Sequence, residues 1–280
     1  MDSKRTKIFL DSADIKETQI ALKLLGFLHG QTTNPSLLAK NLSDKKYTTA
    51  ELLGAYKATI LEIYKLIPEG AISIEVYADE ETSAEEMLTQ AREFNTWIPG
   101  AYIKYPCVPE GLKAVEISVK EGINVNITLV FSQAQASAVY SATLGAKKGQ
   151  VFISPFVGRL DDIGQRGTDL VKNILNMYKA GDGHVEVLCA SVRSKEHILE
   201  AISLGCDILT APLKVLEQAK AEILNQSKIN EVKNLPMLQP IEYENLILSK
   251  PWQKYDLNHV LTEQGLKKFA EDWNSLSITL

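Results

Sequence analysis

The chain has 280 residues, which is enough for two small domains or for one large α/β domain. Its hydrophobic content of 45% supports a sizeable core, and its charged content of 23% is ordinary for a soluble protein. The net charge of −5 gives no electrostatic reason to expect a nucleic acid or a membrane as a partner, although a local cationic pocket for phosphorylated substrates is compatible with it.

Eight short β-rich runs recur along the chain, with amphipathic helical patterns between them. The predicted strands cover Lys7–Asp11, Gly30–Thr33, Ala71–Tyr77, Ala101–Tyr105, Val125–Val130, Val151–Phe156, Val185–Ala190 and Cys206–Thr210. The helical patterns include a capping box at Ser83–Glu86 and apolar periodicity in Glu110–Lys120, Ser132–Leu144, Asp161–Tyr178 and Lys195–Leu204. Eight βα units in this length predict a (β/α)₈ barrel with its active site at the carboxyl ends of the strands. A doubly wound sheet is the alternative, but no G-x-G-x-x-G follows an early strand.

Beyond Gln218 the pattern changes. The segment Asn225–Lys254 is polar and interrupted by three prolines, and a helical stretch over Thr262–Leu276 follows it. That stretch carries apolar residues at i, i+3, i+4 and i+7 from Leu266, so one of its faces must dock. We therefore expect one domain over residues 1–280, in which residues 225–280 form a C-terminal extension that packs on the barrel or on a neighbouring subunit. The second arrangement would make the protein a homo-oligomer.

The cysteines and the N-terminus indicate the compartment. Cys107, Cys189 and Cys206 are far apart and include no C-x-x-C pair, which fits a reducing environment and argues against a disulfide framework or a zinc site. The polar residues 1–7 lead directly into the first strand, with no apolar core of a signal peptide and no later stretch long enough to cross a bilayer. We expect a cytoplasmic protein.

Lys104 lies near the end of the fourth predicted strand, in a short and mostly apolar run. A lysine there is costly to bury unless its charge is paired or its pKa falls. A desolvated amine is also a nucleophile toward carbonyl groups, as in Schiff-base enzymes. A lysine that reaches the rim or pairs with a carboxylate is the structural alternative.

Polar side chains stand at the ends of the other strands as well, and strand alternation places several of them on the barrel's inner face. They are Asp11, Asn34, Glu75, Asn126, Thr128, Ser154 and Ser191. Each is explicable alone as a helix cap or a satisfied buried group, and capping is a real alternative for Asp11 and Asn34. Together they form a site in which one amine sits among carboxylates and hydroxyls, which fits carbonyl chemistry with general acid–base assistance.

Two arginines extend this site. Arg159 and Arg193 follow Ser154 and Ser191 on consecutive loops, and late loops of barrel enzymes often bind phosphate. Arginine recognises phosphate through two parallel hydrogen bonds. The alternative is a pair of surface arginines that bind neighbouring carboxylates such as Asp162. The four histidines show no triad and no metal-ligand spacing.

At these strand ends the sequence resembles transaldolase. The matching stretches occur in order between about Lys7 and Leu216, and they cover residues 9–14, 32–38, 103–106 with 110–114, 122–129, 153–159 and 190–193. The C-terminal residues 261–266 and 269–273 are also similar to transaldolase C-termini.

The resemblance implies a cofactor-free Schiff-base enzyme of the pentose phosphate pathway, which acts on sugar phosphates such as fructose 6-phosphate or sedoheptulose 7-phosphate. Lys104 would attack the ketose carbonyl, Asp11 would take the proton from the C4 hydroxyl, and a dihydroxyacetone enamine would remain on the lysine for transfer to an aldose phosphate. Glu75 and Thr128 would hold the water that carries protons. The remaining substrate contacts would come from Thr33, Asn34, Asn126, Ser154 and Phe156, and those to phosphate from Arg159, Ser191 and Arg193.

Two residues bear on the related fructose-6-phosphate aldolases, which are the alternative assignment. Those aldolases carry glutamine where this chain has Glu75 and tyrosine where it has Phe156, so both positions favour transfer over simple cleavage. A non-catalytic barrel that binds sugar phosphates is a further alternative. The chain departs from transaldolases at Tyr105 and at Val108, where threonine is usual, and we expect a local loop change there rather than lost chemistry.

Overall fold

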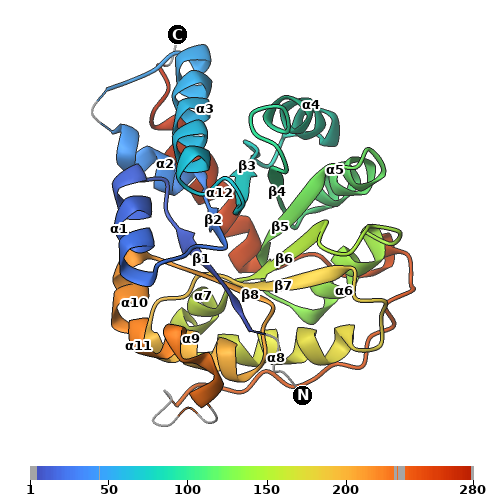
Figure 1. Cartoon of the computed structure of the whole chain (residues 1–280). Helices are drawn as coiled ribbons and strands as arrows, with labels where there is room; N and C mark the ends of the chain where they lie inside the picture. Colours follow the sequence, from blue (N-terminus) through green and yellow to red (C-terminus); the bar gives the residue numbers. More distant parts are fainter. Residues whose placement is uncertain (1–4, 44, 230–231, 233–236, 279–280) are drawn as a thin grey trace.

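The computed structural model describes residues 5–43, 45–229, 232 and 237–278 (Figure 1). Eight parallel strands pair in chain order and close into a barrel, which confirms the predicted (β/α)₈ fold. The strands are β1 (Lys7–Asp11), β2 (Gly30–Thr32), β3 (Ala71–Glu75), β4 (Tyr102–Pro106), β5 (Asn124–Val130), β6 (Val151–Pro155), β7 (Val185–Cys189) and β8 (Ile208–Ala211).

Helices follow the strands, and most of them form the outer layer of the barrel (Figure 1). They are α1 (Ile15–Leu25), α2 (Pro35–Leu42), α3 (Thr49–Leu66), α4 (Ala84–Phe94), α5 (Pro109–Lys120), α6 (Gln133–Ala142), α7 (Val157–Asp162), α8 (Gly167–Tyr178), α9 (Lys195–Ser203), α10 (Leu213–Gln218), α11 (Lys220–Leu224) and α12 (Val260–Asn274), with 3₁₀ turns η1 (Gln226–Lys228) and η2 (Trp252–Lys254). The predicted capping box at the start of α4 is present, with Ser83 and Glu86 bonded to each other's backbone. None of the helices in the described ranges is long and apolar enough to span a membrane.

The helix predicted over Asp161–Tyr178 was wrong at its start. The chain forms two helices there, α7 and α8, separated by a turn in which Gly164 has a φ of +84°. That left-handed backbone conformation ends α7 and suits glycine. The carboxylate of Asp161 then accepts a hydrogen bond from the backbone N–H of Gly167 at the start of α8, at 2.9 Å. The break matters for function because it makes α7 a separate short helix directly after β6.

The barrel interior is filled by aromatic rings beneath its polar mouth. The ring of Phe152 stacks on that of Tyr102 with centroids 4.0 Å apart, and it meets Phe9 edge to face at 6.0 Å. Gly30 makes room for this packing, because a Cβ there would lie 2.6 Å from the Phe9 ring and 2.3 Å from the carbonyl oxygen of Ala71. The interior is therefore a closed core, and ligands can approach only from an end of the barrel.

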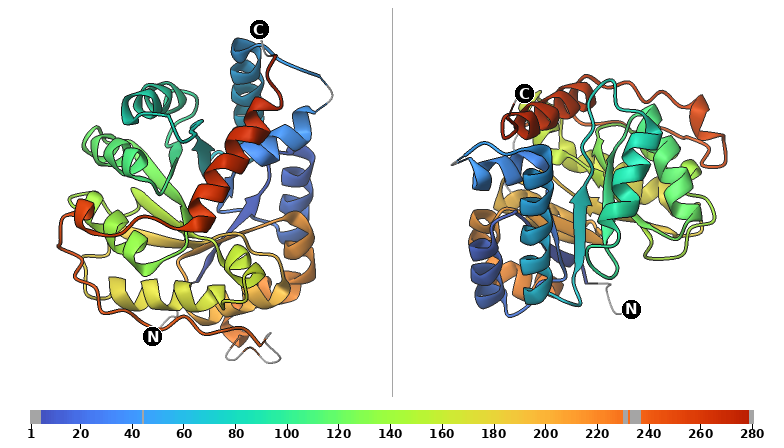
Figure 2. Two further views of the ribbon diagram at one scale, coloured as in Figure 1. Left: turned by 180° about the vertical axis from the view of Figure 1, so that it is seen from behind. Right: turned by 90° about the horizontal axis from the view of Figure 1, so that it is seen from above.

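The C-terminal helix α12 lies across the carboxyl-end face of the barrel (Figure 2, left). It packs mainly against α2 and also contacts β5. Its buried apolar face includes Leu266, Phe269 and Trp273, as the helical spacing predicted. Trp273 reaches the first half of the chain, where its ring lies 6.0 Å from that of Tyr56 and 6.2 Å from that of Tyr77. The end of the chain thus closes over the strand ends that carry the polar residues.

Candidate active site

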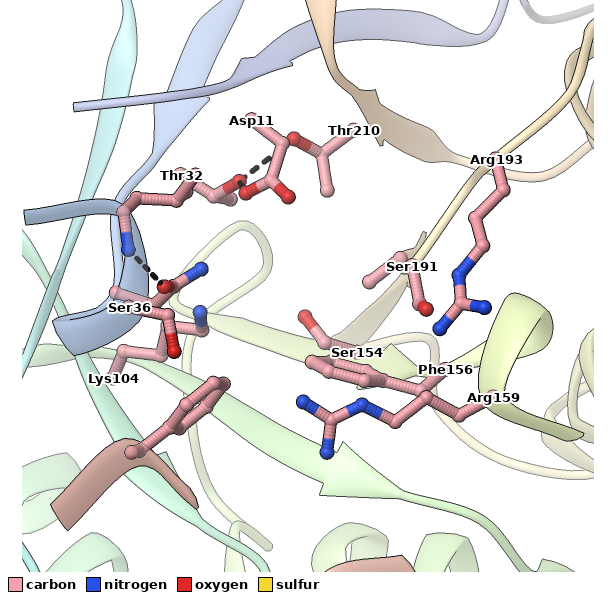
Figure 3. A pocket seen from close by; sticks show the side chains of 14 residues that line it. Asp11, Thr32, Ser36, Lys104, Ser154, Phe156, Arg159, Ser191, Arg193 and Thr210 are labelled. Atoms are coloured by element: carbon pink, nitrogen blue, oxygen red, sulfur yellow. Dashed lines mark hydrogen bonds between the residues drawn. The ribbon is translucent and has the colours of Figure 1, made fainter. Parts of the chain in front are cut away.

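A cavity of about 200 Å³ opens at the carboxyl ends of the strands (Figure 3). It is lined by side chains from the strand ends, from α2, from α7 and from α12. The lining consists of Asp11, Thr32, Asn34, Ser36, Leu37, Lys104, Ser154, Phe156, Arg159, Ala190, Ser191, Arg193, Thr210 and Phe269. Most of the site residues predicted from the sequence are in this set. Thr33, Glu75, Asn126 and Thr128 are not, and they lie behind or beside it.

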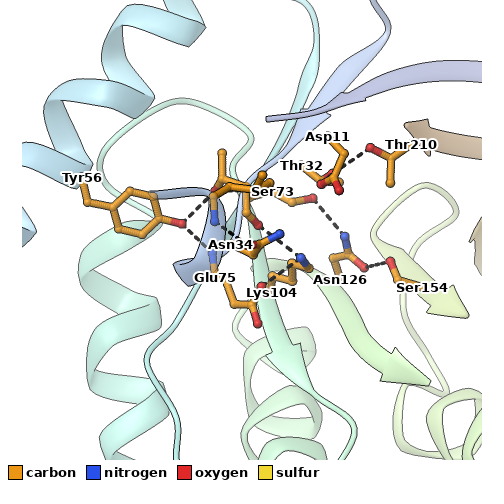
Figure 4. A network of polar contacts seen from close by, with 12 residues as sticks. Asp11, Thr32, Asn34, Tyr56, Ser73, Glu75, Lys104, Asn126, Ser154 and Thr210 are labelled. Atoms are coloured by element: carbon orange, nitrogen blue, oxygen red, sulfur yellow. Dashed lines mark hydrogen bonds and ion pairs between the residues drawn. The ribbon is translucent and has the colours of Figure 1, made fainter. Parts of the chain in front are cut away.

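Lys104 is buried and its charge is paired (Figure 4). Its Nζ lies 2.9 Å from Oε2 of Glu75 and donates a hydrogen bond to the backbone carbonyl of Thr33 at 3.2 Å. Only 4% of the lysine side chain and 3% of the glutamate side chain are exposed. Burial raises the pKa of Glu75, and the positive charge of Lys104 partly opposes that rise. The ion pair therefore offsets part of the free-energy cost of burying the lysine charge. Lys104 still lines the cavity.

Asp11 faces the same cavity from β1. Its Oδ1 accepts a hydrogen bond from the hydroxyl of Thr32 at 2.7 Å, and the hydroxyl of Thr210 lies 2.7 Å from that of Thr32. Asp11 is not the N-cap of the following helix, because Asp14 holds that position. Burial raises the pKa of Asp11, and Lys104 again opposes the shift. A carboxylate with a raised pKa is a better proton acceptor than an exposed one.

A chain of hydrogen bonds orients the floor of the cavity (Figure 4). The amide nitrogen of Asn126 donates to the hydroxyl of Ser73 at 3.0 Å, and the hydroxyl of Ser154 donates to Oδ1 of Asn126 at 2.7 Å. All three side chains are buried. Sequence analysis missed Ser73, although it stands two residues before Glu75 and so shares its face of β3.

Asn34 and Thr33 follow β2 and have different roles. Asn34 lines the cavity and also caps α2, where its Oδ1 accepts the backbone N–H of Leu37 at 2.9 Å. The capping alternative was therefore right for Asn34, and the cap leaves its amide nitrogen free to donate elsewhere. The hydroxyl of Thr33 points away from the cavity, toward Tyr56 at 2.8 Å and the carbonyl of Ser73 at 2.9 Å. Its backbone, rather than its side chain, contacts Lys104.

Thr128 lies two residues after Asn126 on β5, so the two side chains share one face of the strand. Its hydroxyl is buried and has no hydrogen-bond partner within the described part of the chain. The next residue, Leu129, has a φ of +59°, and its carbonyl accepts a hydrogen bond from the hydroxyl of Thr262 on α12 at 2.9 Å. A non-glycine residue in the left-handed region is uncommon and costs free energy. α12 therefore holds the strand end that carries Thr128.

The two arginines reach the cavity from neighbouring loops (Figure 3). The guanidinium carbon of Arg159 lies 5.3 Å from the ring centroid of Phe156 and 5.5 Å from that of Phe269. Arg193 pairs with the carboxylate of Asp162 through Nη1, at 2.5 and 2.7 Å, so the predicted surface pair is present. Burial lowers the pKa of Arg159, and the nearby charge of Arg193 adds to the effect. Two guanidinium groups beside one small cavity favour an anionic ligand over a cationic one.

Comparison with known proteins places this geometry in a family. The model of the family described as Transaldolase/Fructose-6-phosphate aldolase matches residues 8–280. The chain belongs to this family. A probable transaldolase of Dehalococcoides mccartyi is 36% identical over 270 residues, covering 96% of this chain and 99% of that protein. A probable transaldolase of Alkaliphilus metalliredigens is 37% identical over the same shares.

A solved structure of low sequence identity shares the fold. The 3-hexulose-6-phosphate synthase of Salmonella typhimurium matches with a TM-score of 0.50 at 13% identity, covering 79% of this chain and 99% of that one. At that identity the likeness shows a common barrel and nothing more. The resemblance found at the strand ends is thus confirmed at the level of the transaldolase/fructose-6-phosphate aldolase family.

Several lining residues were not predicted from the sequence. Thr210 is the penultimate residue of the last strand, Ser36 lies in the first turn of α2, and Phe269 comes from α12. Ser36 also donates a hydrogen bond to the carboxylate of Asp272, which ties α2 to α12. The apolar spacing had shown that Phe269 docks, but only the folded chain shows that it docks at the mouth.

The two positions that the sequence analysis singled out as departures from the transaldolase pattern lie outside the cavity. Tyr105 is buried and its hydroxyl lies 2.7 Å from that of Ser118 on α5. Val108 is the N-cap of α5 and makes no side-chain hydrogen bond to the helix. Both changes therefore alter the packing and capping of α5 rather than the cavity lining. Within the described ranges, no three His, Cys, Asp or Glu side chains are grouped as a metal site requires.

Proposed function

We propose that the protein is a transaldolase, which moves a dihydroxyacetone unit from a ketose phosphate to an aldose phosphate through a Schiff base on Lys104. The observation that carries the proposal is the buried Lys104 at the cavity, 2.9 Å from Glu75 and in the same cavity as Asp11. This arrangement supplies a nucleophilic amine, a proton acceptor for that amine, and a separate base for the substrate. The family assignment supports the same reaction class.

The first half of the reaction forms the imine. The lysine must be a neutral amine to attack the C2 carbonyl, and burial raises the pKa of Glu75, so that glutamate is suited to accept the proton from Lys104. Addition gives a carbinolamine, which loses water to form the protonated imine. The buried and unpartnered hydroxyl of Thr128 supports a role in holding the water that carries protons between these groups.

The second half breaks the C3–C4 bond. Asp11 takes the proton of the C4 hydroxyl, the bonding electrons move into the protonated imine, and the aldehyde fragment departs. The dihydroxyacetone enamine then attacks the aldehyde of the acceptor, Asp11 returns the proton, and water releases the new ketose from Lys104. Arg159 and Arg193 are placed to bind the phosphate of either sugar, since both line the cavity beside Ser191.

The proposal is tested by trapping the imine. Borohydride added with fructose 6-phosphate should leave a reduced dihydroxyacetone adduct on Lys104, found by mass spectrometry of the peptide around it. Lys104→Met should abolish the adduct and lower turnover by about 10⁴-fold or more, because the covalent step is lost. Lys113→Met, on the exposed face of α5, is the control and should leave both unchanged.

Three results would contradict the proposal in different ways. Full turnover in Lys104→Met would remove Lys104 as the nucleophile. Adduct formation with rapid release of free dihydroxyacetone, whether or not an aldose phosphate is present, would make the protein a fructose-6-phosphate aldolase. Sugar phosphate binding without any adduct would favour a non-catalytic barrel.

A further inference from the structure

The backbone of the loop that carries Arg193 is held by a histidine that takes no part in the chemistry proposed above. The loop runs from the end of β7 to the start of α9, and Ser191 within it has a φ of +56°. The backbone N–H of Arg193 donates a hydrogen bond to Nδ1 of His197, at 3.2 Å. A left-handed serine is costly, so such a loop needs partners that fix its conformation.

His197 is itself oriented by an aspartate from another element. Its Nε2 lies 2.7 Å from Oδ2 of Asp161, and only 10% of its side chain is exposed. Because a backbone N–H can only donate, Nδ1 must accept, and the ring proton must be on Nε2 and point at Asp161. The other oxygen of Asp161 accepts the N–H of Gly167 at the start of α8. Both ring nitrogens and both carboxylate oxygens are therefore used.

The aspartate belongs to α7, the short helix that also carries Arg159. α7 contacts the same loop at two further points. Asp162 binds the guanidinium group of Arg193, and the N–H of Gly158 donates to the carbonyl of Ser191 at 3.0 Å. A Cβ at Gly158 would lie 2.4 Å from that carbonyl oxygen, so the approach requires glycine. α7 and the loop are fastened together, and their two arginines enter the cavity as one unit.

We propose that Asp161 and His197 are positioning residues for substrate phosphate. They fix the backbone of Arg193 relative to α7, so that its guanidinium group and that of Arg159 converge on one anion. This inference rests on the transaldolase function proposed above and deepens it. It assigns a role in the affinity for phosphorylated sugars to residues that touch neither the sugar nor Lys104.

The test compares two donors that leave the same adduct on Lys104. Fructose 6-phosphate and dihydroxyacetone both give a reduced dihydroxyacetone lysine with borohydride, but only the first carries phosphate. His197→Ala should raise the half-saturating concentration for trapping with fructose 6-phosphate about tenfold, because the hydrogen bonds of a mostly buried histidine are lost. The value for dihydroxyacetone should not change. Asp161→Asn should act in the same direction.

Two further variants sharpen the test. His197→Asn keeps an acceptor near the position of Nδ1 but cannot reach Asp161, so it should show a smaller rise than alanine. His184→Asn is the matched control, because His184 is a buried histidine that also pairs with an aspartate, the exposed Asp182, before β7 at the opposite end of the barrel. It should change neither half-saturating concentration.

The outcomes separate this inference from the proposed function. An unchanged value for fructose 6-phosphate in folded His197→Ala or His197→Asn would overturn the inference alone. An equal rise for both donors would also overturn it, since that result indicates a general structural role. No adduct from either donor with the unaltered protein would overturn the transaldolase function and this inference with it.

Discussion

Asp11 and Glu75 place two carboxyl groups around one lysine, from β1 and β3 respectively. Burial raises the pKa of both carboxyl groups, and Lys104 opposes each shift. Asp11 also raises the pKa of Glu75, so the protonation of each carboxyl group depends on that of the other. A site that must take up and release protons at several steps needs acids of this kind.

We expect Asp11→Asn to separate the transfer reaction from imine formation. Asparagine keeps an oxygen for Thr32 but cannot take the C4 proton, so kcat for transfer should fall by about 10²–10⁴-fold. Trapping of dihydroxyacetone on Lys104 should persist, since imine formation does not use Asp11. A steady-state assay and borohydride trapping measure the two effects. Loss of both together would show that Asp11 acts on the imine as well.

The same variant should be more stable than the parent at neutral pH. The pKa of Asp11 is raised in the folded state above its ordinary value of 3.8, so the parent loses stability as pH rises from that value through the folded-state pKa. Asparagine does not titrate, and its advantage should therefore disappear below about pH 4. Urea unfolding at several pH values measures this difference.

Asp182→Asn is the control of opposite sign. Hydrogen bonds from Tyr140 and His184 lower the pKa of Asp182 to about 2, so its stabilising effect is present at neutral pH and lost as pH falls through that value. This variant should be less stable than the parent at pH 7 and approach it in acid. The same pH slope in both variants would contradict the opposed shifts.

At the level of elements, α5 lacks the side-chain cap that the helices on either side of it in the chain, α4 and α6, both have. Most of the neighbouring helices begin with a side chain that accepts a backbone N–H, as Asn34 and Ser83 do. α5 begins with Val108, whose φ of −125° and ψ of 164° are those of an N-cap but whose side chain cannot accept. Pro109 at the first helical position supports the start of the helix only through its fixed φ.

We expect Val108→Thr to stabilise the protein. Threonine in the same backbone conformation can accept a free N–H of the first turn, which is worth about 1 kcal/mol at such positions. Turnover should not change, because Val108 does not line the cavity. Chemical unfolding measures the gain, and Val108→Ala, which adds no acceptor, is the control. A gain in the alanine variant would attribute the effect to shape rather than to the cap.

Elements whose sequence repeats a simple period could be predicted, and those fixed by tertiary contacts could not. The short β-rich runs predicted the positions of β1 to β8. Because parallel strands of a barrel end on the same face, they also predicted that Lys104 lies in one site with Asp11 and Ser154. The break between α7 and α8 was missed, since it depends on one left-handed residue, Gly164, in an otherwise helical pattern. The position of Phe269 was also missed, because periodicity shows that a face docks without showing where.

At the scale of the molecule, the last helix, α12, connects the C-terminal part of the chain to the site through a contact with α3. Trp273 on α12 packs against Tyr56 on α3, more than two hundred positions earlier. The hydroxyl of Tyr56 accepts the backbone N–H of Glu75 at 3.0 Å and lies 2.8 Å from that of Thr33. Both of those residues contact Lys104. The ring contact between Trp273 and Tyr56 is therefore linked to Lys104 through Glu75 and Thr33, which both contact Tyr56 and Lys104.

We therefore expect Trp273→Ala to lower both stability and turnover. The side chain is 7% exposed, and removing a buried tryptophan costs about 3–5 kcal/mol. Tyr56 would lose a ring that supports it, so the backbone of Glu75 would be less firmly placed and kcat should fall, by about tenfold if the misplacement is small.

Trp252→Ala is the matched control, since Trp252 is 6% exposed and donates to Glu116, on the outer layer away from the cavity. It should lose comparable stability, by urea unfolding followed by circular dichroism, and keep its kcat. Equal kcat in both variants would show that α12 stabilises the barrel without positioning Glu75.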